Sequence, residues 1–289
     1  MSDLAVVTPS YAPDLELFAD LRRSVLEYFP GDVTHFVIVP RRDVDAFARF
    51  RGPRCEVVQE SALVPRHVLK VPRTGFYVNA RRPLPPIRGW VVQQLLKLAS
   101  VQLVTANTIV LVDSDVVFVR PVDQDTFAPG GRARFFRLDA AIDDRLPRHV
   151  RWHAVASRLL GVPADDLPLP DYVTSLNTWD RDAVLGLLQR IEDVAGKRWF
   201  DVIGSELHFS EWTLYGKYMD HFMDVAPSSD TLCHAYWDPR PLDRPGADRF
   251  VSGIAKSDVA VMISAKSRTP LAVRREAMSN RARFRNASA

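Results

Sequence analysis

Two aspartates separated by one serine are the residues of this chain best placed to do chemistry. Asp113 and Asp115 directly follow Thr108–Val112, an aliphatic run typical of a strand buried on both faces of a parallel sheet. Ligands of open α/β sheets bind just outside the carboxyl ends of such strands. Two carboxylates this close repel each other, and a divalent cation that prefers oxygen ligands, Mg²⁺ or Mn²⁺, keeps both ionised. The pattern indicates a metal or phosphate site; the simpler alternative is a polar turn that happens to contain two aspartates.

The residues before the aspartates alternate between strand and helix patterns. Strands are predicted at Leu4–Thr8, His35–Val39 and Cys55–Val58, with helices at Asp14–Tyr28 and Asp43–Phe50, the first of them capped by Asp14. This alternation predicts the opening of a doubly wound sheet with right-handed crossovers, and therefore an α/β fold.

Two different segments connect the third predicted strand to the aspartates. Ser61–Arg88 contains five prolines and several basic residues, so we expect a long loop that either covers a phosphate or is simply solvated. Gly89–Ala106 repeats apolar residues at helical spacing and is predicted to be a helix that carries Gln94 and Lys97.

The second half of the chain adds further candidate site residues. Predicted strands cover residues 133–138, 172–176 and 258–264, and predicted helices cover 148–160 and 180–195, the latter capped by Asp180. Asn177 follows a strand, Glu211 opens a helix capped by Ser210, and His234 lies in a short β-like stretch. A final helix is expected from Thr269 onward, followed by a frayed basic tail.

Composition limits the classes of partner. The 289 residues are 47% hydrophobic and 25% charged, and the net charge of +3 does not call for nucleic acid. Cys55 and Cys233 are far apart and have no metal-ligand spacing, which is typical of free thiols in a reducing compartment. Neither a signal peptide nor a membrane-spanning run is recognisable, so we expect a cytoplasmic protein without a transmembrane segment.

Taken in order, these pieces resemble the GT-A-fold, DxD-containing, metal-dependent glycosyltransferases. The resemblance rests on Ala5–Tyr11, Trp90–Leu98, Ile109–Asp115, Ser175–Thr178, Ser210–Trp212 and His234. It implies a GT-A-like, Rossmann-type mixed sheet flanked by helices in a single large domain. Residues 1–122 would form the nucleotide-sugar half, 123–266 the acceptor-binding and catalytic half, and 267–289 a basic C-terminal helix and tail.

The resemblance also implies roles for individual residues. The donor nucleotide sugar would contact Thr8, Pro9, Ser10, Tyr11, Gln94, Lys97, Asp113, Ser114, Asp115 and Asn177. Mn²⁺ or Mg²⁺ would be held by Asp115 with His234 and Asp113, and Glu211 would be the base of an inverting reaction or a sugar-positioning residue of a retaining one. The chain departs from the family pattern at Trp212, where a second acid is common, and at Tyr11-Ala12-Pro13, which replaces the more usual Tyr-Asn-Arg.

Two other functions fit part of the pattern. A haloacid-dehalogenase-like phosphotransferase would use Asp113 as nucleophile and Asp115 as general acid and base, but that motif normally opens its fold, whereas three predicted strands come first here. A catalytically inactive sugar- or nucleotide-binding protein would use the tryptophans for stacking. The acceptor of a glycosyltransferase would be a glycan, a lipid-linked molecule or a small molecule, and Arg268–Arg285 could contact an anionic membrane surface.

Overall fold

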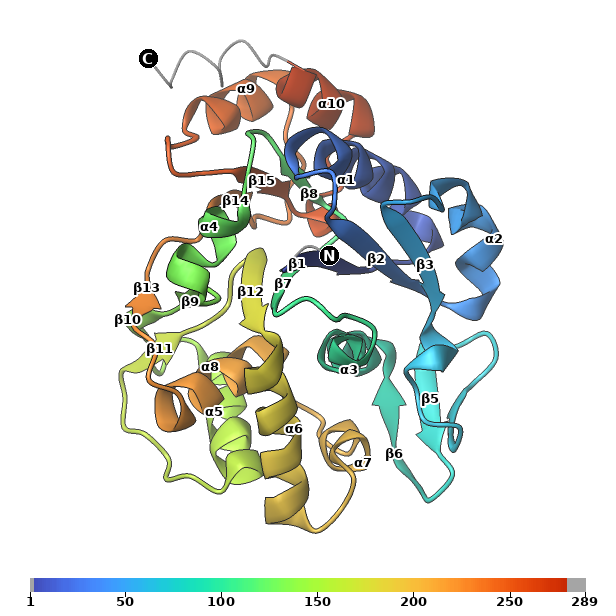
Figure 1. Cartoon of the computed structure of the whole chain (residues 1–289), viewed down its shortest axis with the longest axis vertical. Coiled ribbons are helices and arrows are strands. Elements are labelled where there is room, and N and C mark those ends of the chain that lie inside the picture. The colour runs from blue at the N-terminus through green and yellow to red at the C-terminus, as the bar shows by residue number, and fades with distance from the viewer. Residues whose placement is uncertain (1–2, 280–289) are drawn as a thin grey trace.

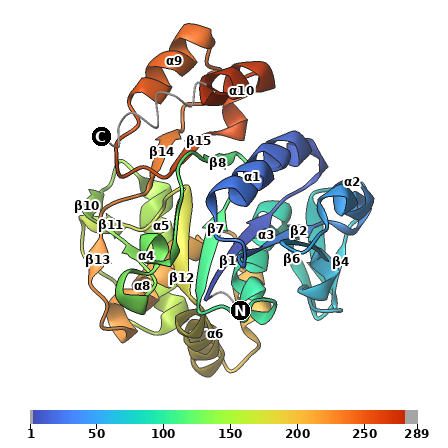
Figure 2. The ribbon, with the colours of Figure 1, turned by 45° about the horizontal axis from the view of Figure 1, so that its top comes forward.

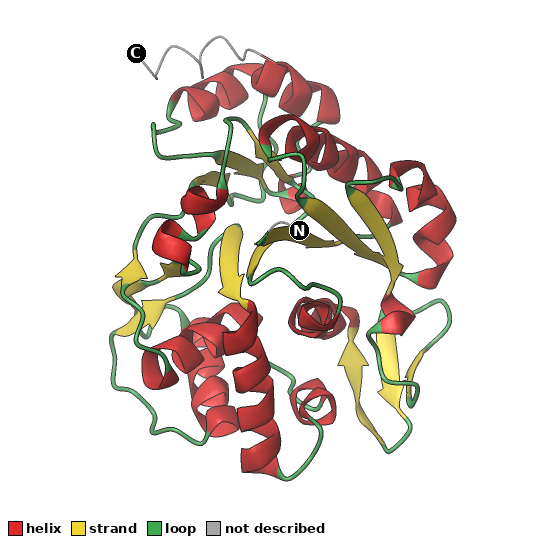
Figure 3. Ribbon diagram, in the orientation of Figure 1, coloured by secondary structure: helices red, strands yellow, loops and turns green. Residues whose placement is uncertain are grey.

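The structure, a computed structural model that describes residues 3–279, is built around one five-stranded mixed sheet (Figures 1 and 3). In spatial order its strands are β12 (Leu176–Asp180), β7 (Thr108–Val112), β1 (Leu4–Pro9), β2 (Thr34–Val39) and β3 (Cys55–Gln59). The strands β7, β1, β2 and β3 are parallel, and β12 runs antiparallel to β7. The predicted α/β class, with a mixed sheet flanked by helices, is confirmed.

Helices cover both faces of this sheet because its strands are apolar on both sides. In β7, Val110 and Val112 pack on the same side as α1 (Leu15–Tyr28), whereas Ile109 and Leu111 pack on the side of α3 (Gly89–Ala99). The α3 side also receives α5 (Pro147–Leu160), α6 (Arg181–Ala195), α7 (Trp199–Gly204) and α8 (Glu211–Phe222). Figure 1 shows α3 end-on beneath the sheet, with α5, α6 and α8 to one side of it.

A second sheet joins the residues after the aspartates to the C-terminal part of the chain. It consists of β14 (Cys233–Tyr236), β15 (Ala260–Ile263) and β8 (Val116–Phe118), in that order. Figure 2 shows α9 (Arg244–Ser252) and α10 (Leu271–Ser279) beside each other at this end of the molecule. Val119, which follows β8, and Val261 of β15 pack with residues of both helices. The two helices therefore hold β8, the strand that follows Asp115, in place.

The proline-rich segment is not the loop that its composition predicted. It forms a three-stranded antiparallel sheet of β4 (Val68–Lys70), β5 (Phe76–Asn79) and β6 (Arg82–Arg88). Its prolines are compatible with this sheet because three of them, Pro83, Pro85 and Pro86, lie in β6, an edge strand on which missing N–H groups are tolerated. The prediction was wrong because it weighed the prolines above the β-branched and aromatic residues between them.

Other boundaries differ from prediction more modestly. Helix α3 ends at Ala99 and continues only as a 3₁₀ turn, and the strand expected at 133–138 is divided into β9 (Phe135–Phe136) and β10 (Leu138–Ile142). The strand expected at 172–176 begins instead at Leu176, so Asn177 lies inside it. The remaining short elements are α2 (Val44–Phe47), α4 (Gln124–Phe127), β11 (Leu169–Asp171) and β13 (Pro227–Ser228).

The C-terminal helix expected from Thr269 is present as α10, which ends at Ser279. The rest of the predicted basic tail, and with it the end of the expected membrane-contacting segment, lies outside the described residues. Within residues 3–279 no helix combines the length and the apolar character needed to cross a bilayer.

Replacing the cap of α6 should destabilise the fold by about 1 kcal/mol. Asp180 ends β12 and accepts a hydrogen bond from the backbone N–H of Ala183, which joins the edge of the main sheet to α6. Asp180→Ala removes that acceptor, whereas Asp180→Asn retains a side-chain oxygen and should cost much less. Urea denaturation measures both, with the exposed Asp182→Ala as a control; equal losses for Asp180→Ala and Asp180→Asn would contradict the capping role.

Candidate functional site

The carboxyl ends of β1 and β7 meet where the chain order of the sheet reverses. On one side of β1 the sheet continues to β2 and β3, and on the other side it continues to β7. Two buried serines connect the loops that leave these strands: Ser114 Oγ donates to Ser10 Oγ at 2.8 Å. Such a reversal point is where open α/β sheets bind their ligands, and the serine bond fixes the two loops against each other there.

A buried lysine lies directly beside this point. Lys97 Nζ is 3.1 Å from Asp113 Oδ1 and 3.0 Å from Glu211 Oε1, and it donates a hydrogen bond to the latter. The side chains of Lys97 and Glu211 are each 5% exposed, whereas that of Asp113 is 50% exposed. The structure therefore brings together three predicted site residues, and only Asp113 offers its carboxylate to solvent.

The electrostatics of this group favour a charged lysine. Burial alone would lower the pKa of Lys97, but the Asp113 and Glu211 carboxylates raise it well above its usual range. Burial raises the pKa of Glu211, and the adjacent Lys97 opposes that rise. Glu211, the predicted base, thus lies beneath the surface with its carboxylate bonded to Lys97.

Gln94 connects the helix that carries Lys97 to the helix that begins with Glu211. Its side-chain Oε1 accepts a hydrogen bond from the backbone N–H of Glu211 at 3.2 Å, and its Nε2 donates to the carbonyl of Trp90 at 3.4 Å. Ser210 caps α8 by accepting from the N–H of Thr213, as predicted. Gln94 is buried, so its position indicates a bracing role for the α3–α8 junction.

Asp115, at the other end of the Asp113–Asp115 turn, is held by a backbone hydrogen bond. Its Oδ2 accepts a hydrogen bond from the backbone N–H of Ala265 at 2.7 Å, in the loop that follows β15. Arg274 fixes the same loop by donating to the carbonyls of Ile263, Ser264 and Thr269. Burial and the nearby Asp113 carboxylate raise the pKa of Asp115 to about 6, although the Ala265 N–H and Arg274 oppose the rise.

A third carboxylate, Asp14, belongs to the same electrostatic neighbourhood. It precedes α1 as expected, but its side chain makes no capping hydrogen bond. Burial and the Asp113 charge raise the pKa of Asp14 to about 6, and Arg274 opposes the rise. The sequence placed Asp14 shortly after the first strand, yet the capping interpretation concealed its proximity to the aspartate pair.

The predicted metal shell of Asp113, Asp115 and His234 is not assembled. His234 Nε2 is hydrogen-bonded to the carbonyl of Phe250 at 3.0 Å, and the two rings stack with centroids 4.4 Å apart. Within residues 3–279, no group of three or more His, Cys, Asp or Glu residues is placed to hold one ion. Asp113 and Asp115 alone fit Mg²⁺ or Mn²⁺, because such ions commonly bind one or two carboxylates and take their other ligands from water and substrate phosphates.

Asn177 is the second residue of β12, an edge strand of the main sheet, and it pairs with Leu111 of β7. Its side chain is buried, and its Nδ2 donates to the carbonyl of Tyr172 at 3.3 Å. The residue predicted to line a sugar pocket therefore neighbours the strand that ends in Asp113, and its amide also holds the segment that enters β12.

A cavity of about 360 Å³, which we call the strand-end cavity, opens at the ends of β1, β2 and β3. Its lining includes Pro9, Ser10, Tyr11, Arg42, Glu60, Lys70, Tyr77, Trp90 and Gln93. Tyr11 is 40% exposed, whereas Thr8 is fully buried beneath the cavity and hydrogen-bonded to His35. Three of the four residues predicted in this loop thus reach the cavity.

The sequence interpretation missed the part of this cavity contributed by the small antiparallel sheet. The carboxylate of Glu60 accepts hydrogen bonds from Tyr77 at 2.9 Å and from Lys70 at 3.3 Å. Burial and this carboxylate raise the pKa of Tyr77 above its usual range. No motif marked these residues, because the segment between Ser61 and Arg88 was taken for a loop.

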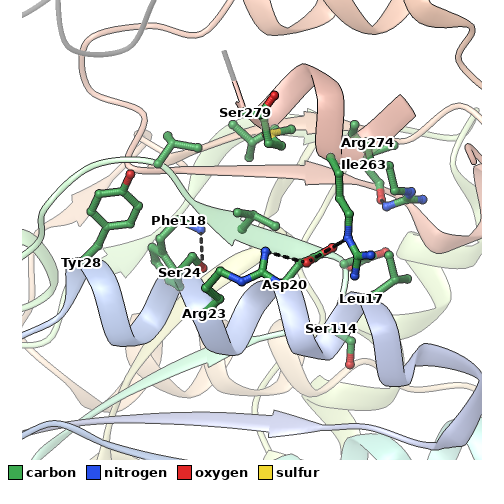
Figure 4. Close-up of a pocket in the computed structure, with 16 residues that line it drawn as sticks. Leu17, Asp20, Arg23, Ser24, Tyr28, Ser114, Phe118, Ile263, Arg274 and Ser279 are labelled. Carbon is green, nitrogen blue, oxygen red and sulfur yellow. Dashed lines mark hydrogen bonds and ion pairs between the residues drawn. The ribbon is translucent and has the colours of Figure 1, made fainter. Parts of the chain in front are cut away.

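A second cavity, of about 350 Å³, lies between α1 and the C-terminal elements (Figure 4). Its lining includes Ser114 and Asp115. Three of its charged residues pair with each other: Asp20 contacts Arg23 at 3.2 Å and Arg275 at 2.8 Å. The lining also contains the charged side chains of Asp115 and Arg274.

Comparison with known protein families gives a match over most of the chain. Residues 4–252 match a protein family described as "Family of unknown function (DUF6492)". No curated protein matches the chain.

Asp115→Asn should stabilise the metal-free protein at neutral pH. The folded-state pKa of Asp115 is about 6 against an ordinary value of 3.8, so ionising this carboxylate above pH 6 disfavours the folded state. Asparagine keeps an oxygen for the Ala265 N–H and carries no charge. The gain in melting temperature, measured in EDTA, should be full above pH 6 and should shrink as the pH falls towards 3.8; a gain that grows towards low pH would contradict it.

Proposed function

We propose that this protein, which belongs to the DUF6492 family, is a metal-dependent glycosyltransferase that uses a nucleoside-diphosphate sugar as donor. The observation that carries the proposal is the convergence of Asp113, Asp115 and Lys97 at the carboxyl end of a central strand, beside a cavity at the sheet's reversal point. In the reaction, the bond from the anomeric carbon to the diphosphate oxygen breaks and a bond to an acceptor hydroxyl oxygen forms. The hydroxyl proton leaves to the diphosphate or to water.

The strand-end cavity suits the nucleoside of the donor. Tyr11 offers a partly exposed ring on which a base can stack. Arg42 and Lys70 line the same cavity, where Arg42 pairs with Asp43 at 3.5 Å and Lys70 with Glu60 at 3.3 Å. Ser10 lines this cavity and is bonded to Ser114 of the aspartate turn. A nucleoside bound there would direct its diphosphate towards Asp113 and Asp115.

A divalent ion held by Asp113 and Asp115 would supply positive charge for the departing diphosphate. The chain's own contribution is to orient both carboxylates. Lys97 holds one oxygen of Asp113 and leaves the other side of that carboxylate exposed. The Ala265 N–H holds Asp115 in the same way.

Glu211 is assigned to positioning Lys97. It is buried, it accepts a hydrogen bond from Lys97, and Gln94 binds its backbone N–H. A carboxylate in this setting orients a cation more readily than it removes a proton from an acceptor. The proposal therefore does not require Glu211 to act as general base, the role expected of it in an inverting reaction.

Binding of nucleoside diphosphates should depend on both metal and Asp115. A ligand that binds only the folded state raises its stability by about 2.7 kcal/mol at roughly 100 times Kd. We expect melting temperature to rise with UDP- or GDP-type ligands plus Mn²⁺ and the rise to vanish in EDTA. Asp115→Asn should lose the shift, whereas Asp125→Asn, an exposed aspartate on α4, should retain it.

Two results would contradict the proposal. One is the absence of a shift with every nucleotide and nucleotide sugar at millimolar concentration, which would leave a binding function for another ligand. The other is hydrolysis of a phosphomonoester that Asp113→Asn abolishes, since this is the behaviour of a haloacid-dehalogenase-like nucleophile.

A further inference from the structure

The N-terminal halves of α3 and α5 bring two tryptophans and an arginine together. Trp90 and Trp152 stack with ring centroids 6.2 Å apart and an interplanar angle of 29°. The guanidinium carbon of Arg148 lies 5.8 Å from each of these two ring centroids. His149 packs edge-on against Trp152 with centroids 4.5 Å apart, so the aromatic surface is held rigidly.

Further cations gather around the same place. Loss of solvent and the charges of Arg151, Arg88 and Arg148 lower the pKa of His208. Within residues 3–279, none of these three arginines forms an ion pair with a carboxylate, in contrast to Arg145 and Arg158, which pair at 2.6 and 2.7 Å. The group therefore carries a concentration of positive charge that the described part of the chain does not neutralise. We call Arg88, Trp90, Arg148, Arg151, Trp152 and His208 the Trp90–Arg148 cluster.

The positions of Arg148 and Arg151 do not favour the stability of α5. Helix α5 begins at Pro147 with no acidic residue in its first turn and no side-chain cap. Arg148 and Arg151 lie in its first two turns, where the partial positive charge of the helix terminus disfavours cations. A bound anion would reverse this, because the helix terminus and the guanidinium groups would attract it together.

Two enclosed nitrogens of the cluster lack a hydrogen-bond partner among the described residues. They are Nε of Arg88 and Nε1 of Trp152. Trp152 is only 7% exposed. An enclosed donor without an acceptor costs stability, and a ligand oxygen that reached either nitrogen would remove this cost. Trp90, which is 40% exposed as a residue, adds an aromatic side chain that a sugar ring can contact.

The cluster adjoins the candidate active site. Trp90 also lines the strand-end cavity, and its carbonyl accepts from Gln94 one turn further along α3. Lys97 follows seven residues after Trp90, about 10 Å along the helix axis. Figure 1 places α3 between β5 and β6 on one side and α5, α6 and α8 on the other. Trp90 of α3 thus contacts Trp152 of α5 and also lines the strand-end cavity.

We infer that the Trp90–Arg148 cluster binds the acceptor, and that the acceptor is a saccharide carrying a phosphate or carboxylate group. Its ring stacks on Trp90, and its anionic group is bound by Arg88, Arg148 and Arg151, whose planar guanidinium groups match both kinds of oxyanion. The role as acceptor rests on the proposed function; the binding of an anionic saccharide does not.

The test is a titration of the full chain with glucose 6-phosphate and with an oligosaccharide of galacturonate, followed by tryptophan fluorescence and calorimetry. The two ligands distinguish phosphate from carboxylate recognition, and glucose and inorganic phosphate are the controls. We expect at least one anionic saccharide to bind more tightly than either control. Arg148→Gln and Arg151→Gln, both at exposed positions, should each weaken it about tenfold or more. Trp90→Ala should weaken it as well.

Matched controls separate this site from general charge effects and from the donor site. Arg82→Gln, exposed beside a different basic cavity, should leave the affinity unchanged. The arginine variants should also keep the metal-dependent thermal shift with nucleotides. A donor shift that is absent in every variant and in the unaltered protein, with saccharide binding intact, would overturn the glycosyltransferase assignment and leave this binding site standing.

Four outcomes overturn the inference. Three of them are equal affinity for glucose and for both anionic saccharides, equal affinity for inorganic phosphate and the sugar phosphate, and an affinity that Arg148→Gln and Arg151→Gln leave unchanged. The fourth is failure of both anionic saccharides to bind at millimolar concentration.

Discussion

The ion pairs of Lys97 with Asp113 and Glu211 are the interaction on which the candidate site depends. A buried ammonium group requires compensating charge, and here the compensation comes from the end of β7 and from the first residue of α8. The same contacts therefore fix three elements that are far apart in the sequence: α3, the aspartate turn and α8. Removing Lys97 would leave the buried Glu211 carboxylate without its ion pair, so the geometry of the turn and the stability of the helix junction are coupled.

Around Asp14 and Asp115, on the opposite side of the turn, negative charge is compensated only in part. Asp14 and Asp115 have raised pKa values because burial and the Asp113 charge disfavour their ionised forms, and Arg274 compensates only in part. Carboxylates with raised pKa values at the open end of a strand are typical of functional sites, because a bound cation relieves the repulsion. The turn is thus anchored by a cation on one side and deficient in positive charge on the other, which is the arrangement expected of a site that binds a metal together with a phosphate.

Local sequence patterns predicted the elements that carry this site, but not their mutual contacts. The aliphatic run before Asp113, the helical spacing around Lys97 and the Ser210 cap were all recognisable, because buried strands and capped helices have strong local signatures. The pairing of Lys97 with Glu211 was not, because it joins residues 114 positions apart. The hydrogen bond of His234 to the Phe250 carbonyl was not predicted for the same reason, because only the three-dimensional packing directs its ring there. The small sheet between Ser61 and Arg88 was not predicted, because prolines on an edge strand resemble those of a loop. The contribution of Glu60, Lys70 and Tyr77 to the strand-end cavity was therefore not predicted either.

The central claim is that Asp113 and Asp115 hold a divalent ion together with a nucleoside diphosphate. Electron paramagnetic resonance of Mn²⁺ tests it most directly, because free and bound ions give different signals. The account predicts weak Mn²⁺ binding by the protein alone, much tighter binding when UDP or GDP is present, and loss of that binding in Asp113→Asn. Mn²⁺ binding that is indifferent to the nucleotide, or that survives in both Asp113→Asn and Asp115→Asn, would contradict it.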